Sequence, residues 1–144
     1  MQSVRIMEFP ACRMVASPVG MFGDGALEAF MTWMENQPRG IFHRDFLTWD
    51  AEKQGFRWLY LYEDGMEIPQ PLSVIDFQGG LYAVATDIDQ QTDKAAMDAE
   101  VEAFLAHNGL MRDPERPDLG NIITTPAARD ILGYEQMDYY YPVK

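Results

Sequence analysis

The chain has 144 residues, a length typical of one compact domain, and its 23 acidic and 11 basic residues give a net charge of -12. This charge argues against binding to a nucleic-acid backbone and favours cationic partners. The single cysteine, Cys12, excludes an intrachain disulfide and a thiolate zinc cluster, and no apolar run approaches the ~20 residues of a membrane span. We expect a cytoplasmic protein with no cofactor, no metal, and no direct contact with nucleic acid or membrane.

The chain contains an internal repeat. Residues 6–16 (IMEFPACRMVA) align without a gap with residues 74–84 (VIDFQGGLYAV), and each copy is followed by a turn-rich gap and then a helical pattern. We predict two copies of one unit, about residues 1–68 and 72–144, joined by a short linker that its prolines stiffen. Together they form a single domain.

One amphipathic helix is predicted in each copy. Apolar residues at i, i+3, i+4 and i+7 indicate a helix that begins after Asp24 and ends near Pro38. A second pattern indicates a helix that begins after Thr92 or Asp93 and ends at Asn108, before a glycine. The apolar stripes are expected to pack onto a sheet.

Two strands are predicted after each helix. They cover about residues 46–50 and 56–62 in the first copy, and about 121–125 and 134–143 in the second, where Gly120 marks a loop before the strand. The order β-α-β-β, found twice, predicts an α+β fold with mostly antiparallel strands and helices on one face of the sheet.

Aromatic side chains alternate along residues 56–62. Phe56, Trp58, Tyr60 and Tyr62 share one side of this strand, and Leu59 shares the other side with a second leucine. We assign the leucines to the helix side. The aromatic side is then either a second core layer or the wall of a ligand groove, and we favour the groove.

The last strand combines acids with tyrosines. Glu135, Tyr139 and Tyr141 share one face, whereas Asp138 and Tyr140 share the other. Aromatic rings attract cations, and a nearby carboxylate strengthens the attraction. The run is therefore typical either of a site for lipophilic cations or of a strand that simply closes the sheet.

Motifs for catalysis and metal binding are missing. His43 and His107 have no partner at metal-ligand spacing, and the sequence has neither a Walker-type loop nor a GxSxG motif. No serine, threonine or cysteine is paired with a base by a local pattern. A hydrolase built from carboxylates and tyrosines stays open as an alternative to plain binding.

The second half of the chain resembles the GyrI-like small-molecule-binding domains. The features that carry the resemblance are residues 79–84 (GGLYAV), the helix that follows them, Arg116-Pro117 and the final Tyr-Pro-Val-Lys. This family includes AraC-type effector-binding domains of multidrug-responsive regulators and gyrase inhibitory proteins. The resemblance implies two β-α-β-β units with pseudo-twofold symmetry, a curved sheet with helices on its outer face, and a groove for bulky aromatic or cationic compounds. Some members inhibit gyrase by direct contact, and a few are hydrolases.

One departure from the family concerns charge. The family commonly carries a Glu on the strand after the Arg-Pro loop, and here that position falls at Gly120 or Asn121. Either another acid, Glu135 or Asp138, supplies the negative charge, or the ligand is less strictly cationic.

The leading hypothesis is non-enzymatic binding of a bulky aromatic, cationic small molecule in an aromatic groove between the two repeats, by a stand-alone effector- or drug-binding protein or a regulator's ligand domain. The alternatives are a protein-interaction module, such as one that binds a regulator or inhibits DNA gyrase, and a GyrI-like hydrolase. No catalytic residue is assigned. The predicted ligand-binding residues are Trp49, Trp58, Tyr60, Tyr82, Asn121, Glu135, Tyr139 and Tyr141.

Overall fold

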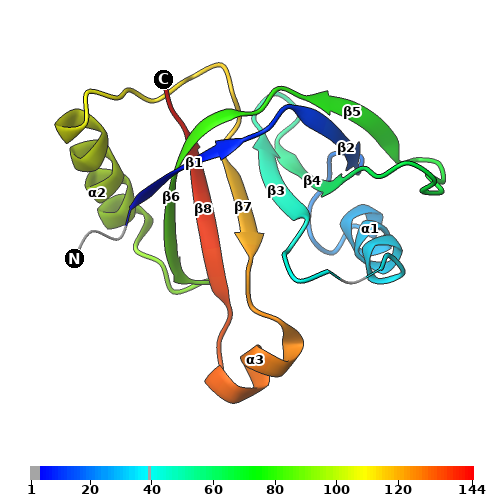
Figure 1. Ribbon diagram of the computed structural model, residues 1–144. Helices are drawn as coiled ribbons and strands as arrows, with labels where there is room; N and C mark the ends of the chain where they lie inside the picture. The colour runs from blue at the N-terminus through cyan, green and yellow to red at the C-terminus, as the bar shows by residue number, and fades with distance from the viewer. Residues whose placement is uncertain (1–3, 39) are drawn as a thin grey trace. The chain divides into compact units, whose positions relative to one another are not determined.

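The computed structural model describes residues 4–38 and 40–144, which form two compact units (Figure 1). The central unit spans Pro10–Gly79 and contains β2 (Cys12–Ala16), α1 (Ala26–Glu35), β3 (Asp45–Asp50), β4 (Gly55–Leu61) and β5 (Ser73–Phe77). The terminal unit joins the residues up to Phe9 to Gly80–Lys144. It contains β1 (Arg5–Phe9), β6 (Gly80–Ile88), α2 (Lys94–His107), β7 (Leu119–Ile122), α3 (Pro126–Leu132) and β8 (Gln136–Pro142).

The two aligned segments of the repeat each form two strands rather than one. The first segment breaks at Pro10, and the second breaks at Gly79 and Gly80, whose positive φ angles of 73° and 122° suit glycine. As a result β1 pairs with β6 of the second repeat, and β5 pairs with β2 of the first. Each compact unit therefore combines strands from both repeats.

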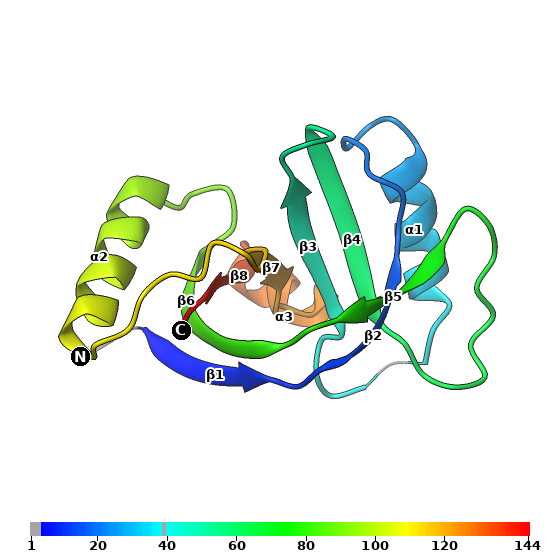
Figure 2. The same ribbon diagram turned by 90° about the horizontal axis from the view of Figure 1, so that it is seen from above.

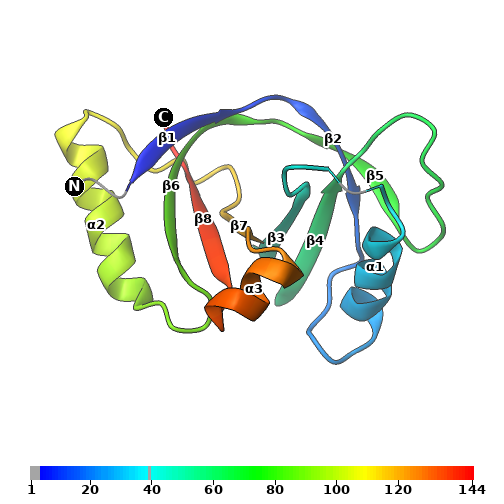
Figure 3. The same ribbon diagram turned by 60° about the horizontal axis from the view of Figure 1, so that its bottom comes forward.

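Both sheets are antiparallel, and their strand orders are β1-β6-β8-β7 in the terminal unit and β3-β4-β2-β5 in the central unit. One face of each sheet packs against a long helix, which confirms the α+β prediction. In the central unit α1 lies beside the strands (Figure 2), and its buried residues are Leu27 and Phe30. In the terminal unit α2 lies beside the strands (Figure 3), and its buried residues are Met97, Val101 and Leu105.

Helix ends follow the predicted capping with one difference. Asp93 caps α2 by accepting a hydrogen bond from the Ala96 amide at 3.1 Å. At α1 the N-cap is Gly25 instead of Asp24, which accepts a hydrogen bond from the Ala26 amide at 2.9 Å. Within the described residues, no helix has the length and apolar character that crossing a bilayer requires.

The aromatic row of β4 lies on the opposite face from the one predicted. Trp58 stacks on Phe30 of α1 with ring centroids 6.1 Å apart, and Tyr60 meets Trp33 of α1 edge-to-face at 5.5 Å. The leucines occupy the helix-free face, where Leu59 is buried. Alternation correctly predicted which side chains share a face. It could not predict which face meets the helix, because both faces of β4 carry apolar side chains. The larger aromatic rings fill the space beneath α1.

Two local features of the terminal unit also differ from prediction. Gly120 lies inside β7 instead of before it, and the end of the Met137 side chain occupies the space that a Cβ would take there. A short helix, α3, follows β7 where no helix was predicted. Thr125 caps it by accepting a hydrogen bond from the Ala128 amide, and Pro126 occupies its first turn.

A candidate ligand-binding face on the terminal unit

The helix-free face of the terminal sheet collects polar side chains from neighbouring strands. Thr86 of β6 lies opposite Asp138 of β8, which in turn lies opposite Asn121 of β7. Side chains at such paired positions project from the same face and approach closely. Arg5 of β1 projects from this face too, because it pairs with Val84, two residues from Thr86. We call Arg5, Thr86, Asn121 and Asp138 the polar cluster.

Hydrogen bonds join three members of the polar cluster. Arg5 donates from Nη2 to Asp138 Oδ2 at 2.8 Å and from Nη1 to Thr86 Oγ1 at 3.1 Å, and the Thr86 hydroxyl donates to Asp138 Oδ1. The Asp138 side chain is only 7% exposed, whereas that of Arg5 is 45% exposed. The carboxylate is thus a fixed, buried acceptor, and its cationic partner reaches it from solvent.

Two buried polar atoms on the same face have no hydrogen-bond partner in the part of the chain that the structure describes. They are Asn121 Oδ1 and the Tyr82 hydroxyl, and these residues are 6% and 1% exposed. A buried polar group without a partner costs about 1–3 kcal/mol. Such groups are rare in a packed core, and a bound water, ion or ligand normally completes them.

Tyrosine rings form the apolar part of this face. Tyr82 lies edge-on to Phe9 and to Tyr140, with 6.1 Å between ring centroids in each pair, and Arg116 lies 4.8 Å from the Tyr82 ring centroid. Burial raises the pKa of Tyr82, against the opposing effect of Arg116. Burial, reinforced by Asp138, raises the pKa of Tyr140 to about 12. Both hydroxyls are therefore protonated at neutral pH.

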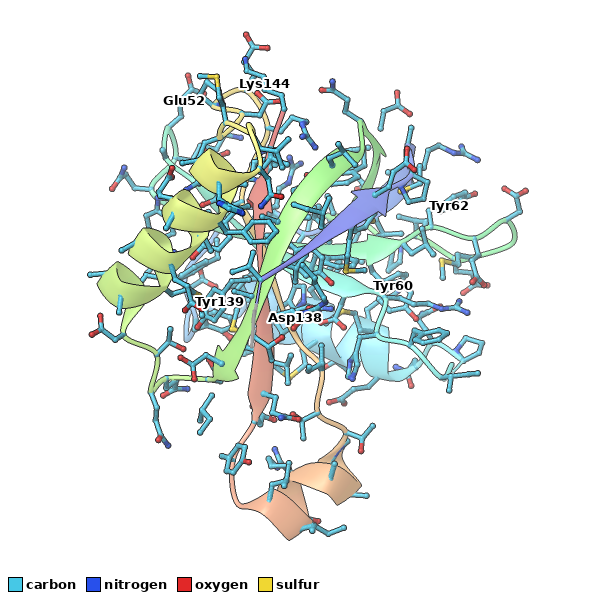
Figure 4. All side chains as sticks on the ribbon, turned by 60° about the vertical axis from the view of Figure 1, so that its left-hand side comes forward. Glu52, Tyr60, Tyr62, Asp138, Tyr139 and Lys144 are labelled. Atoms are coloured by element: carbon cyan, nitrogen blue, oxygen red, sulfur yellow. The ribbon has the colours of Figure 1, made fainter. Side chains whose placement is uncertain are left out.

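Tyr139 and Tyr141 lie on the other side of β8, against α2 and away from the polar cluster. Figure 4 shows Tyr139 toward α2 and Asp138 away from it. Tyr141 donates to Asp98 Oδ1 and accepts from Lys94 Nζ, both at 2.8 Å, and the Tyr139 hydroxyl donates to Thr92. Burial raises the pKa of Tyr141, and its hydrogen bond to Asp98 raises it further. These tyrosines tie the strand to its helix.

The other predicted residues lie away from the polar cluster. Trp58 and Tyr60 pack beneath α1 in the central unit, and Trp49, 45% exposed, lies on that same side of the sheet against Phe56 at 4.9 Å. Glu135 precedes β8 and forms an ion pair with Arg129 of α3 at 3.4 Å. Of the eight predicted residues, only Tyr82 and Asn121 share the helix-free face of the terminal sheet.

Arg5 and Thr86 were missing from the sequence prediction, and Asp138 entered only as an alternative acid. For Thr86 the signal is a polar residue at a spacing of two from the buried Val84 and four from the buried Tyr82. It became visible only once the strand pairing was known. The described residues hold no group of three or more metal-ligand side chains.

No protein-family model matches the chain, and no curated protein is similar to it in sequence. Solved structures do match. A hydrolase from Listeria innocua superposes with a TM-score of 0.70 at 10% identity, over 99% of this chain and 92% of that one. The EcmrR C-terminal domain has a TM-score of 0.65 at 10% identity, over 98% and 96% of the two chains. SAV2435, determined bound to tetraphenylphosphonium, has a TM-score of 0.55 at 11% identity, over 98% and 93%.

These matches define the class by its fold, an α+β domain in which the antiparallel strands of each compact unit pack against one long helix. The fold is the one expected from the resemblance to GyrI-like domains, and it is shared with the EcmrR C-terminal domain and with SAV2435.

Proposed function

We propose that this chain binds a small aromatic ligand on the helix-free face of its terminal sheet and does not catalyse a reaction of that ligand. Tyr82 and Tyr140 supply the apolar surface, and the polar cluster supplies the hydrogen-bonding groups. Binding sites of this kind combine a mainly apolar wall with a few fixed polar groups.

The unpaired Asn121 Oδ1 is the observation that carries the proposal. The atom is buried and lies across the β7–β8 pair from the buried Asp138 carboxylate. A structure that served stability alone would gain by replacing this amide with an apolar side chain. Retaining it suggests a ligand that donates a hydrogen bond to it.

A positively charged ligand could take the place of Arg5 as the partner of the buried Asp138 carboxylate. Asp138 supplies a carboxylate on the strand next to the one where the family's Glu is expected, and the whole chain carries a net charge of -12. The shared fold with SAV2435, bound to tetraphenylphosphonium, supports the same ligand class. The protein would then act as an effector- or drug-binding module, alone or as the ligand domain of a regulator.

Thermal unfolding with a panel of compounds tests the proposal. The panel contains tetraphenylphosphonium, benzamidine and the neutral triphenylphosphine oxide. A ligand at about 100 times its Kd stabilises the native state by about 2.7 kcal/mol, which raises Tm by several degrees. We expect this shift for benzamidine, which carries N–H donors, with the wild-type protein, and we expect its loss in Asn121→Leu.

Trp49→Ala tests the competing prediction that an aromatic wall in the central unit binds the ligand. Loss of the shift in Trp49→Ala, with Asn121→Leu unaffected, would place the site in the central unit instead. The absence of a shift with every compound would contradict the proposal. All three tryptophans lie in the central unit, so calorimetry is a better second readout than tryptophan quenching.

A hydrolase is a second candidate, favoured by the shared fold with the hydrolase from Listeria innocua. It conflicts with the geometry, since Asp138 already binds Arg5 and Thr86, and Glu135 pairs with Arg129. Steady hydrolysis of nitrophenyl esters that is lost in Asp138→Asn or Glu135→Gln, with binding retained, would favour this candidate.

A further inference from the structure

Arg5 is held by the polar cluster as a ligand would be held. Its guanidinium spans two acceptors, Asp138 Oδ2 at 2.8 Å and Thr86 Oγ1 at 3.1 Å. The acceptors lie on the inner strands β6 and β8, whereas Arg5 comes from the edge strand β1. The acceptors are therefore fixed by the sheet, and the exposed Arg5 side chain can swing into solvent. Such an arrangement is a preformed site for a planar group with several N–H donors.

The cluster also holds one acceptor that Arg5 leaves unsatisfied. The strand order is β1-β6-β8-β7, so Arg5 reaches Asp138 across β6, while Asn121 lies beyond Asp138 on β7. Asn121 Oδ1 has no partner among the described residues. A planar donor group centred over β8 and β7 could hydrogen-bond to both Asp138 and Asn121, which gives it an advantage over Arg5.

We propose that the polar cluster recognises amidinium or guanidinium compounds with an aromatic body, and that Arg5 is an internal competitor for the same acceptors. This inference rests on the proposed function and narrows its ligand class. Quaternary ammonium and phosphonium cations have no N–H donors. To bind at Asp138 they must displace Arg5, which leaves the carboxylate and the Thr86 hydroxyl without the hydrogen bonds that Arg5 donates. They also donate none to Asn121 Oδ1, which stays unsatisfied. A site built around hydrogen bonds discriminates strongly against ligands that lack them.

Competition by Arg5 sets the size of the expected effect. The apparent Kd equals the intrinsic Kd divided by the fraction of molecules in which the acceptors are free. If Arg5 leaves Asp138 free in about one molecule in ten, removing the side chain tightens binding about tenfold.

Calorimetric titration of Arg5→Ala with two aromatic cations tests the inference. Benzamidine carries N–H donors, and phenyltrimethylammonium carries the same charge without them. We expect Arg5→Ala to bind benzamidine at least about tenfold more tightly than the wild-type protein does. Phenyltrimethylammonium should gain far less, and adding Asp138→Asn or Asn121→Leu should remove the gain.

Arg13→Ala is the matched control. It makes the same change in net charge, and Arg13 belongs to an exposed ion pair with Asp64 at 3.4 Å in the central unit. Its benzamidine affinity should equal that of the wild-type protein. Arg5→Lys keeps the charge but not the planar fork, and its affinity for benzamidine should lie between those of the wild-type protein and Arg5→Ala. It keeps the test available if Arg5→Ala does not fold.

The outcomes separate this inference from the proposed function. An equal gain for both cations, or no gain for benzamidine while other compounds still bind the wild-type protein through Asn121, overturns the inference and leaves the proposed function standing. Failure of every compound with every variant overturns both.

Discussion

The two sheets follow one plan, yet equivalent positions on their helix-free faces carry opposite chemistry. Val84 pairs with Arg5 and Tyr140, as Ala16 pairs with Ser73 and Leu59. Two residues further along, the pair Asp138 and Asn121 in the terminal unit corresponds to Arg57 and Thr48 in the central unit. The two units thus share one pattern of strand pairing, whereas different side chains at equivalent positions give the terminal unit its candidate site.

The tyrosines and tryptophans show the same contrast. In the central unit the aromatic row of β4 supports α1, and the helix-free face holds aliphatic residues such as Met14 and Leu59, both buried. In the terminal unit Tyr82 and Tyr140 occupy the helix-free face beside the polar cluster. Aromatic content alone therefore does not locate a ligand site, and the buried polar groups are the more specific sign.

The largest expected effect comes from the aromatic packing in the central unit. Phe30 is completely buried against Trp58, so Phe30→Ala should lower the free energy of unfolding by about 3–5 kcal/mol, measured by urea denaturation. Met31→Ala is the control, because its side chain is 38% exposed, and it should change stability by less than about 0.5 kcal/mol. A loss below about 1 kcal/mol for Phe30→Ala would mean that the aromatic row is not core.

Much of the fold could be predicted from the sequence, because periodicity and capping are local. Both long helices and the four strands that follow them were confirmed within a few residues. The breaks at Pro10 and Gly79 were missed, since a broken strand keeps its alternation on both sides. So was α3, whose seven residues bury no side chain and leave Ile131 86% exposed.

The candidate site was less predictable for a physical reason. Alternation says that Tyr139 and Tyr141 share a face, but only the contacts with α2 show that this face is covered. Arg5 and Asp138 are 133 residues apart in sequence, and their ion pair depends on β1 joining the second repeat's strands. Nothing local to either residue indicates the other.

A smaller effect separates the equivalent charged positions of the two sheets. Asp138→Asn weakens a network of three hydrogen bonds around a buried carboxylate, and should cost about 1.5–3 kcal/mol, toward the lower end because Arg5 stays hydrated. Arg57→Gln removes a single 3.2 Å hydrogen bond to the Ser17 carbonyl and should cost about 0.5–1.5 kcal/mol. Equal losses in urea denaturation would contradict the asymmetry.

The smallest effect is a pH dependence that belongs to the terminal unit. Burial raises the pKa of Tyr140 to about 12, whereas an unfolded tyrosine titrates near its ordinary value of about 10. The stabilisation from keeping this hydroxyl protonated is fully present below pH ~10 and is lost as pH rises toward 12. For this one group, stability should fall by about 1 kcal/mol between about pH 10 and 11.

Tyr140→Phe removes this titrating group, so its stability should fall less steeply with pH than that of the wild-type protein. Urea denaturation at a series of alkaline pH values measures the difference. Identical pH slopes for Tyr140→Phe and the wild-type protein would show that Tyr140 is not protected from ionisation.

Two optical probes test whether the units unfold together at alkaline pH. Five of the seven tyrosines lie in the terminal unit and all three tryptophans lie in the central unit, so tyrosinate absorbance reports mainly on the terminal unit and tryptophan fluorescence on the central unit. Coincident transitions by the two probes would show that both units unfold together, so that ionisation in the terminal unit also lowers the stability of the central unit.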